Sequence, residues 1–320
     1  MNTLTHAFFR AGFRRHGAAW LLAMLLLGGC QGAVSRSGDA PDRSAPLATY
    51  DLDAPDTLFR LPDPLREISG LAWEGPGRLL AHNDEDGILI RLDAGRGTVL
   101  GQWRFGDDRD YEGVACLGAE AWLVESDGDL FRVSGYDGPS PRVTKYEHAL
   151  SRDQDVEGLA WDGARRLLLA CKDEPGAGLD RDDHKALYAF DPERGVLDEQ
   201  PAVRIGLEEV ATRLRRDVLH GLGPELQAAF KLKGKRRDLF QPSGVAVHPQ
   251  TGRLWVLSAH YRMLAVLDPD GRLRALHALS HPAFPQPEGL CFDPRGVLYL
   301  SSEANNGPSA VLGRFLRERK

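Results

Sequence analysis

Three glutamates stand directly before a glycine that opens an apolar run: Glu112, Glu157 and Glu288. Carboxylates that are brought together repel one another, and removal from water raises the cost of ionising them. Such a group is stable when it holds a cation, shares protons, or accepts hydrogen bonds from backbone N–H groups of neighbouring strands. Oxygen ligands from several segments suit Ca²⁺, which takes roughly six to eight oxygens in loose geometry. The three glutamates are therefore candidate calcium ligands, and capping of backbone N–H groups is the alternative that stays open.

The glutamates belong to a sequence repeat. Five stretches align on one glycine, namely "EISGLAW" (67–73), "DYEGVAC" (110–116), "DVEGLAW" (155–161), "QPSGVAV" (241–247) and "QPEGLCF" (286–292). The glycine recurs about every 45 residues, with one interval about twice as long, and a period in this range indicates a repeat architecture. Each unit continues with tight Gly or Asp-Pro turns and further short apolar strands. Four short strands per unit are typical of a β-propeller blade.

The predicted fold is an all-β propeller with five blades of four antiparallel strands. Residues 48–62, which precede the first unit, have strand character and can supply the fourth strand that the last unit lacks, so that no sheet edge stays exposed. The long interval contains residues 207–238, where Leu207, Val210 and Leu214 follow helical spacing. We expect a short helical insertion there, between blades 3 and 4, and a sixth, degenerate blade is the alternative.

This fold places two sets of side chains at one channel mouth. The first strand of a propeller blade lines the central channel, and it begins on the face where the second strand ends. The residues before the repeat glycines share this face: Ser69, Glu112, Glu157, Ser243 and Glu288. The residues that end the second strands are expected on the same face: Asp84, Asp127, Asp173, His260 and Glu303. We predict that this face binds a ligand, and that the long loop at 172–186 and the basic end of the insertion lie beside it.

The N-terminus has the order of features found in a lipoprotein signal. Basic residues end at Arg15, an apolar run follows at 18–29, and "LGGC" places Cys30 after small residues. The apolar run is too short to span a bilayer. "LGGC" resembles the lipobox of bacterial lipoproteins, in which the cysteine carries fatty acyl chains such as palmitate after signal cleavage. We expect a signal peptide at 1–29, an acylated Cys30 with a flexible tether at 30–48, and the propeller domain at 49–320.

The lipobox resemblance also predicts where the protein resides. Gln31 rather than an aspartate follows Cys30, which among lipoproteins favours the outer membrane, and several acyl chains anchor a protein stably. We expect a lipid-anchored protein of the cell envelope that faces the periplasm. The net charge of −6 argues against nucleic acid as a partner. Cys116, Cys171 and Cys291 lie in apolar runs and are expected to be small buried residues.

The order of the repeat stretches resembles the SdiA-regulated, YjiK-like family of bacterial propeller proteins. The resemblance spans residues 50–318 and is carried by "ISGLAW", "DYEG", "VEGLAW", "PSGVAV" and "PEGLCF", with "CKDEP", "LWVLS" and "SSEANN" behind them. The family shows the same Ser-Glu-Glu-Ser-Glu order before its repeat positions. The resemblance implies a cell-envelope propeller with Ca²⁺ as a candidate ion on the channel. A weaker likeness to esterase-like phytase domains and calcium-dependent lactonase propellers implies an enzyme as the alternative.

The sequence supports three functional interpretations. The first is a propeller that binds a small molecule or a protein partner at its acidic channel face. The second is a Ca²⁺-dependent hydrolase of a phosphoester or lactone, in which the metal polarises the substrate or a bound water, Glu157 or Glu288 acts as base, and His260 assists. The third is a scaffold in an envelope complex. Catalysis and the identity of the ligand stay open, because the chain lacks the common nucleophile, zinc and phosphate-loop motifs.

Overall fold

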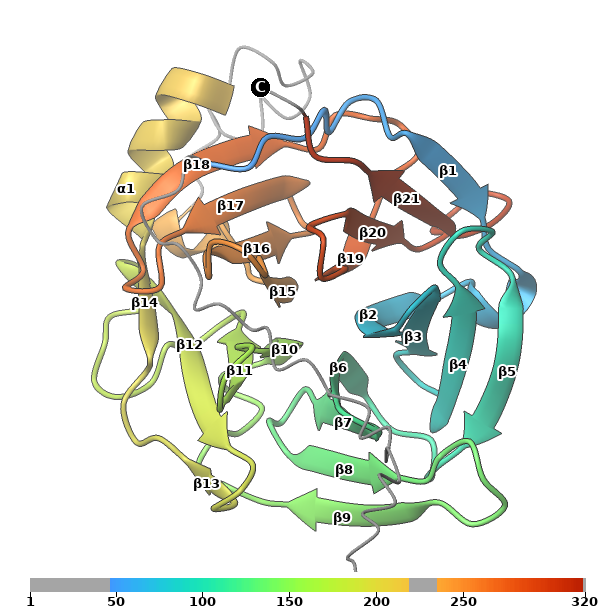
Figure 1. Cartoon of the computed structure of the whole chain (residues 1–320). Helices are drawn as coiled ribbons and strands as arrows, with labels where there is room; N and C mark the ends of the chain where they lie inside the picture. The colour runs from blue at the N-terminus through green and yellow to red at the C-terminus, as the bar shows by residue number, and fades with distance from the viewer. Residues whose placement is uncertain (1–46, 219–234, 319–320) are drawn as a thin grey trace, which may run out of the picture. The chain divides into compact units, whose positions relative to one another are not determined.

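Five antiparallel sheets surround a central axis in the computed structural model (Figure 1), which describes residues 47–218 and 235–318. All of these residues belong to the unit formed by residues 40–320. The predicted signal peptide, Cys30 and the tether up to residue 46 lie outside the described residues, as do residues 219–234 of the insertion. The five sheets are the five blades predicted from the repeat.

Blades 1 to 4 are built from consecutive strands and blade 5 is completed by the first strand of the chain, with the innermost strand of each blade at the channel and the outermost at the rim. Blade 3 has five strands, because two short strands share its outer edge. The strands of blades 1 and 2 are β2 (Ile68–Gly75), β3 (Arg78–Asn83), β4 (Ile88–Asp93), β5 (Val99–Arg104), β6 (Tyr111–Leu117), β7 (Glu120–Glu125), β8 (Leu130–Ser134) and β9 (Arg142–Tyr146). Those of blade 3 are β10 (Val156–Trp161), β11 (Leu167–Cys171), β12 (His184–Asp191), β13 (Val196–Leu197) and β14 (Val203–Gly206). Those of blades 4 and 5 are β15 (Gly244–Val247), β16 (Leu254–Ser258), β17 (Met263–Leu267), β18 (Leu273–Ala278), β19 (Pro287–Phe292), β20 (Leu298–Ser302), β21 (Val311–Phe315) and β1 (Thr57–Arg60).

The repeat glycines allow the innermost strands to pack against one another. Strands β2, β6, β10, β15 and β19 contact each other in a closed ring. A Cβ atom on Gly113 would lie 2.6 Å from the backbone nitrogen of Leu159, and one on Gly244 would lie 2.6 Å from the carbonyl oxygen of Glu288. Both of these neighbours belong to the next blade. Glycine is therefore required at these two positions because backbone meets backbone, whereas at Gly70 and Gly289 a Cβ atom would first meet the side chains of His82 and Ser301.

The segment before the first repeat closes the ring. Strand β1 pairs antiparallel with β21, so the first strand of the chain completes the last blade, as predicted. Just upstream, Tyr50 packs with Trp255 and Phe292, and its hydroxyl donates a hydrogen bond of 2.6 Å to the carbonyl oxygen of Gly296. These contacts hold the residues before β1 on the turns of blades 4 and 5. The closure removes the free edge that a single open sheet would expose.

The long repeat interval is explained by the insertion. Helix α1 (Leu207–Arg213) follows β14 and continues into a π-helical turn at Leu214–Val218. Its buried side chains, Leu207, Val210 and Leu214, join the hydrophobic core between blades 3 and 4. The helical spacing seen in the sequence thus marks a short helix with one buried face, between blades 3 and 4 as predicted.

The three cysteines of the described region are free thiols within the blades. Cys171 and Cys291 are buried and Cys116 is half-buried. Burial raises the pKa of all three thiols. They behave as the small apolar residues that the sequence predicted. In the part of the chain that the structure describes, no helix has the length and apolar character needed to cross a membrane.

Candidate functional site

Four of the five residues that precede the repeat glycines line one cavity at the channel. Ser69, Glu112, Glu157 and Glu288 are each the second residue of an innermost strand. At each of these four positions the register between the first and second strands shifts. Such a bulge leaves one residue unpaired and re-aims its side chain. The bulges therefore direct the three carboxylates and the serine into the same cavity.

Blade 4 differs from the others at this position. Strand β15 begins at Gly244, so Ser243 precedes the strand rather than lying within it. Its hydroxyl accepts a hydrogen bond of 3.0 Å from the backbone N–H of Ala259. Ser258 and Ser302 accept comparable bonds from the backbone N–H groups of Gln241 and Gln286. The backbone-capping role that was an alternative for the glutamates is thus performed here by serines.

A lysine supplies positive charge to the carboxylates. The Nζ atom of Lys172 lies 2.5 Å from Oε1 of Glu157 and 3.1 Å from Oδ2 of Asp155. The Glu157 side chain is 14% exposed and that of Lys172 is 32% exposed. Burial opposes the charged ammonium, but the two carboxylates outweigh it and raise the pKa of Lys172. Sequence analysis missed this residue, although it directly follows the second strand of its blade.

Protons neutralise the remaining charge of the cavity. Burial and the carboxylates of Glu157 and Glu288 raise the pKa of Glu112 to about 10. Burial and the Glu157 carboxylate raise the pKa of Glu288 to about 8. Burial also raises the pKa of Glu157, against the effect of Lys172. At neutral pH the cavity therefore combines protonated glutamates with one lysine–glutamate ion pair.

The residues predicted at the ends of the second strands fall into two groups. Asp84 and Glu303 directly follow β3 and β20, as Lys172 follows β11. Burial, together with the charge of Asp84, raises the pKa of Glu303 to about 7, and burial raises the pKa of Asp84.

Asp127, Asp173 and His260 each lie one residue further along their loops. His260 is exposed, with its ring 4.3 Å from that of Tyr261. The five residues predicted at the ends of the second strands therefore occupy two different positions, one directly after the strand and one a residue further along the loop.

An acidic cluster that could hold a metal lies on the loop between β7 and β8. In the part of the chain that the structure describes, one carboxylate oxygen each of Glu125, Asp127 and Asp129 lies within 4.8 Å of the others. Cations of the protein already contact this cluster, because Arg109 lies 3.2 Å from Glu125 and Lys145 lies 2.5 Å from Asp129. Carboxylate oxygens fit a hard cation such as Ca²⁺, but a bound ion would compete with both side chains.

The acidic loop of blade 3 contacts the basic end of the insertion. Arg236 lies 2.7 Å from Asp183, and Arg237 lies 3.5 Å from Asp182. The first pair is exposed and contributes little stability, while Arg237 of the second pair is half-buried. They bring together the two segments that the sequence predicted to emerge beside the channel.

The comparisons with known proteins agree with this architecture. The SdiA-regulated family profile matches residues 215–306. This match, together with the five-bladed fold, confirms the family resemblance inferred from the repeat. The SdiA-regulated profile covers blade 4 and part of blade 5, so it does not by itself describe the glutamates of blades 2 and 3.

Solved propeller structures are similar at low sequence identity. Glutaminyl cyclase from Myxococcus xanthus is 14% identical, with a TM-score of 0.52 over 82% of this chain and 95% of that chain. The PQQ-bound aldose sugar dehydrogenase from Streptomyces coelicolor is 14% identical, with a TM-score of 0.45 over 86% and 100%. Virginiamycin B lyase from Staphylococcus aureus is 11% identical, with a TM-score of 0.41 over 77% and 67%. The likeness to glutaminyl cyclase supports the fold alone, and the other two structures are too distant to support any conclusion.

Proposed function

We propose that this protein is a lipid-anchored propeller of the cell envelope that binds a ligand or a protein partner at the acidic mouth of its channel. The observation that carries the proposal is the meeting of Glu112, Glu157 and Glu288, one from each of three blades, around a cavity of about 10 Å³, so a ligand would lie at its mouth rather than inside it. Burying ionisable groups costs stability, and clusters with strongly perturbed pKa values are concentrated at functional sites. This cluster is therefore the favoured binding face.

The protonation of the cavity favours a polar ligand. The protonated carboxyl groups of Glu112 and Glu288 offer O–H donors, while the Glu157 carboxylate and its Lys172 partner offer an acceptor and a donor. A ligand with several hydrogen-bonding groups satisfies both kinds of partner. An apolar ligand would leave these buried groups without bonds, which costs about 1–3 kcal/mol for each group.

Native mass spectrometry of the protein purified from envelope membranes tests the binding face. We expect the wild type to retain a bound species that Glu288→Leu loses, because leucine removes the polar contacts at the cavity. Glu199→Leu is the matched control, since Glu199 is exposed near the end of blade 3. The same bound species in all three proteins would place the ligand elsewhere.

Ca²⁺ at the same face is a second proposal, supported by the acidic cluster of Glu125, Asp127 and Asp129. An ion that binds only the folded chain stabilises it by about 2.7 kcal/mol at a hundredfold excess over its dissociation constant. We expect a higher unfolding temperature in Ca²⁺ than in EDTA, and a smaller difference for Asp127→Asn. Glu157→Gln should keep the difference, because Lys172 already neutralises Glu157. Identical unfolding temperatures in Ca²⁺ and EDTA would contradict the calcium site, and the calcium-dependent hydrolase alternative would be excluded as well.

Lipid anchoring through Cys30 is tested by fractionation. We expect Cys30→Ser to release the protein from the membrane fraction, because the acylated sulfur and the new N-terminus are lost together. Cys116→Ser is the control, since it removes a thiol of the propeller and leaves the signal unchanged. If the Cys30→Ser protein partitions into detergent as the wild type does, the anchor is assigned to the wrong residue.

A further inference from the structure

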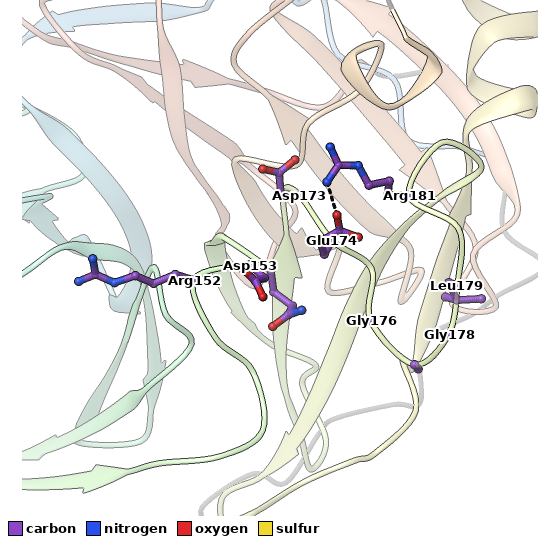
Figure 2. Close-up of a pocket in the computed structure, with 10 residues that line it drawn as sticks. Arg152, Asp153, Asp173, Glu174, Gly176, Gly178, Leu179 and Arg181 are labelled. Carbon is purple, nitrogen blue, oxygen red and sulfur yellow. Dashed lines mark hydrogen bonds and ion pairs between the residues drawn. The ribbon is translucent and has the colours of Figure 1, made fainter.

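Blade 3 carries a polar groove that is separate from the glutamate cavity. Two segments line it, residues 152–154 before β10 and residues 173–181 after β11, and Figure 2 shows them. The groove has a volume of about 660 Å³, which falls in the range of small-molecule sites. None of its lining residues lines the cavity of Glu112, Glu157 and Glu288. An inference about the groove therefore stands independently of the channel proposal.

A buried lysine fixes one wall of the groove. Lys185 is fully buried, and its Nζ atom donates hydrogen bonds to the carbonyl oxygens of Lys172 at 2.5 Å and Asp173 at 3.4 Å. Burial lowers the pKa of Lys185. Burying an ammonium group is costly, and an apolar side chain would fill the same space without that cost. The lysine thus has a specific role, which is to hold the backbone at the start of the loop.

The same loop stores backbone strain. Gly176, Ala177 and Gly178 have φ values of 67°, 48° and 74° in succession. The left-handed conformation costs an alanine about 1–2 kcal/mol. Tyr188 anchors the turn by donating a hydrogen bond of 2.8 Å to the carbonyl oxygen of Pro175. Strained residues that the surroundings hold in place are concentrated at binding sites, and here they form a wall without large side chains.

Backbone pairing joins the two walls. The N–H groups of residues 172, 173 and 174 donate to the carbonyl oxygens of residues 155, 154 and 153 at 2.8, 3.1 and 3.0 Å. The two segments are therefore held in one register before any ligand arrives. A preformed site avoids the entropy cost of ordering its loops on binding.

The charged groups of the groove include both signs. Arg181 donates a hydrogen bond to Glu174, while its Nε atom is buried without an acceptor. Within the described residues, the side chains of Arg152, Asp153 and Asp173 make no hydrogen bond or close ion pair, although the charge of Asp173 acts on Arg181 and Lys185. Figure 2 shows Arg152 and Arg181 at opposite ends of the group, with the carboxylates between them. The unpaired charges are thus one guanidinium and two carboxylates.

We propose that this groove binds a zwitterionic small molecule, a short peptide, with its carboxylate at Arg152 and its ammonium group at Asp153 and Asp173. A purely anionic ligand would meet the carboxylates that line the groove, and a purely cationic ligand would meet two guanidinium groups. Because the Arg152 guanidinium lies at one end of the group and is directed away from Asp153 and Asp173, a ligand that pairs with both ends must be extended, as a dipeptide is. Charge-assisted hydrogen bonds of this kind are the strong ones in binding sites.

Isothermal titration calorimetry of the full-length protein tests the proposal with three probes of similar size. Glycylglycine carries both charges, acetylglycine lacks the ammonium group, and glycinamide lacks the carboxylate. We expect saturable binding of glycylglycine, and binding at least about tenfold weaker for the other two. Arg152→Ala and Asp173→Asn should each weaken glycylglycine binding about tenfold, since each removes one charged contact. Arg142→Ala, which changes an exposed arginine on β9, should leave the affinity unchanged.

Three results would overturn this assignment. The first is the absence of saturable glycylglycine binding, and the second is equal affinity for acetylglycine or glycinamide. The third is an unchanged affinity in both groove variants. Arg152 and Asp173 are exposed and unpaired, so equal unfolding temperatures of the variants and the wild type will verify that only the groove has changed.

Discussion

Gly113→Ala should destabilise the propeller by about 3 kcal/mol, at the upper end of what overpacking costs. The added Cβ atom would lie 2.6 Å from the backbone nitrogen of Leu159 and 2.9 Å from its Cβ atom. These atoms belong to the next blade and cannot rotate away, so the innermost strands of blades 2 and 3 must move apart. The unfolding temperature should fall by roughly 5–10 °C in a thermal melt.

Gly206→Ala is the matched control for this prediction. Gly206 has a φ of −75°, and a Cβ atom added to it would meet no other atom within 4 Å, so alanine fits without strain. Its unfolding temperature should stay close to that of the wild type. Equal stability of the Gly113→Ala and Gly206→Ala proteins would show that backbone contact does not explain the repeat glycine.

Lys172→Met should cost about 2 kcal/mol at pH 8 and less at pH 5. Removing one partner of a fully buried ion pair costs about 3–5 kcal/mol, and the partial exposure of Lys172 reduces this value. Without the ammonium group, the pKa of Glu157 rises further above its unfolded value. The folded state then binds a proton that the unfolded state releases, so stability is lost as the pH rises towards the folded pKa. At pH 5 most of that proton is already bound in the folded state, and the cost is smaller.

A double variant separates the ion pair from the lysine stem. Lys172→Met with Glu157→Gln removes both charges, so most of the stability should return at pH 8. Arg96→Met is the control, because Arg96 pairs with Asp93 while it is 80% exposed, and such pairs contribute little. Chemical unfolding at the two pH values measures each free energy. A Lys172→Met protein with the same loss at both pH values, or a double variant that is no more stable, would contradict the electrostatic account.

The free energy of unfolding of the wild type should also fall as the pH rises. The folded pKa values of Glu112, at about 10, and Glu288, at about 8, lie above that of an exposed glutamate. The folded state therefore holds protons that the unfolded state loses between about pH 4.5 and those values, and stability falls as the pH rises. Glu288→Gln, which stays neutral, should flatten this decline.

The sequence by itself determined the ring and the position of its acids. The spacing of Gly113, Gly158 and the other repeat glycines predicted five blades, because each innermost strand needs one residue without a side chain where it meets the next. The structure, in the residues that it describes, shows five sheets and places a helix rather than a sixth blade in the long interval. The residue before each glycine was thereby placed at the channel. Residues 48–62 were predicted to contain the closing strand because the last repeat unit has only three strands of its own. The local sequence pattern was enough to predict these features, because the innermost strands of neighbouring blades make the same kind of contact in every repeat.

Only the tertiary structure decided how the acids are neutralised. The sequence placed Asp173 at the end of the second strand of blade 3, but β11 ends at Cys171, and Lys172, which directly follows it, pairs with Glu157. The bulges that turn the glutamates inward leave no trace in a single sequence, because a bulge is defined by the partner strand.

The groove of blade 3 also depends on tertiary contacts. Arg152 and Asp173 come from two loops that meet through backbone hydrogen bonds, and Lys185 of β12 is buried where its Nζ atom donates to carbonyl oxygens at the start of one of these loops. A charged residue in a loop reads as solvated surface in a sequence. Its burial and its partners depend on contacts with segments that lie elsewhere in the sequence. A local sequence pattern carries no information about such contacts, and this is the physical reason that the groove could not be predicted.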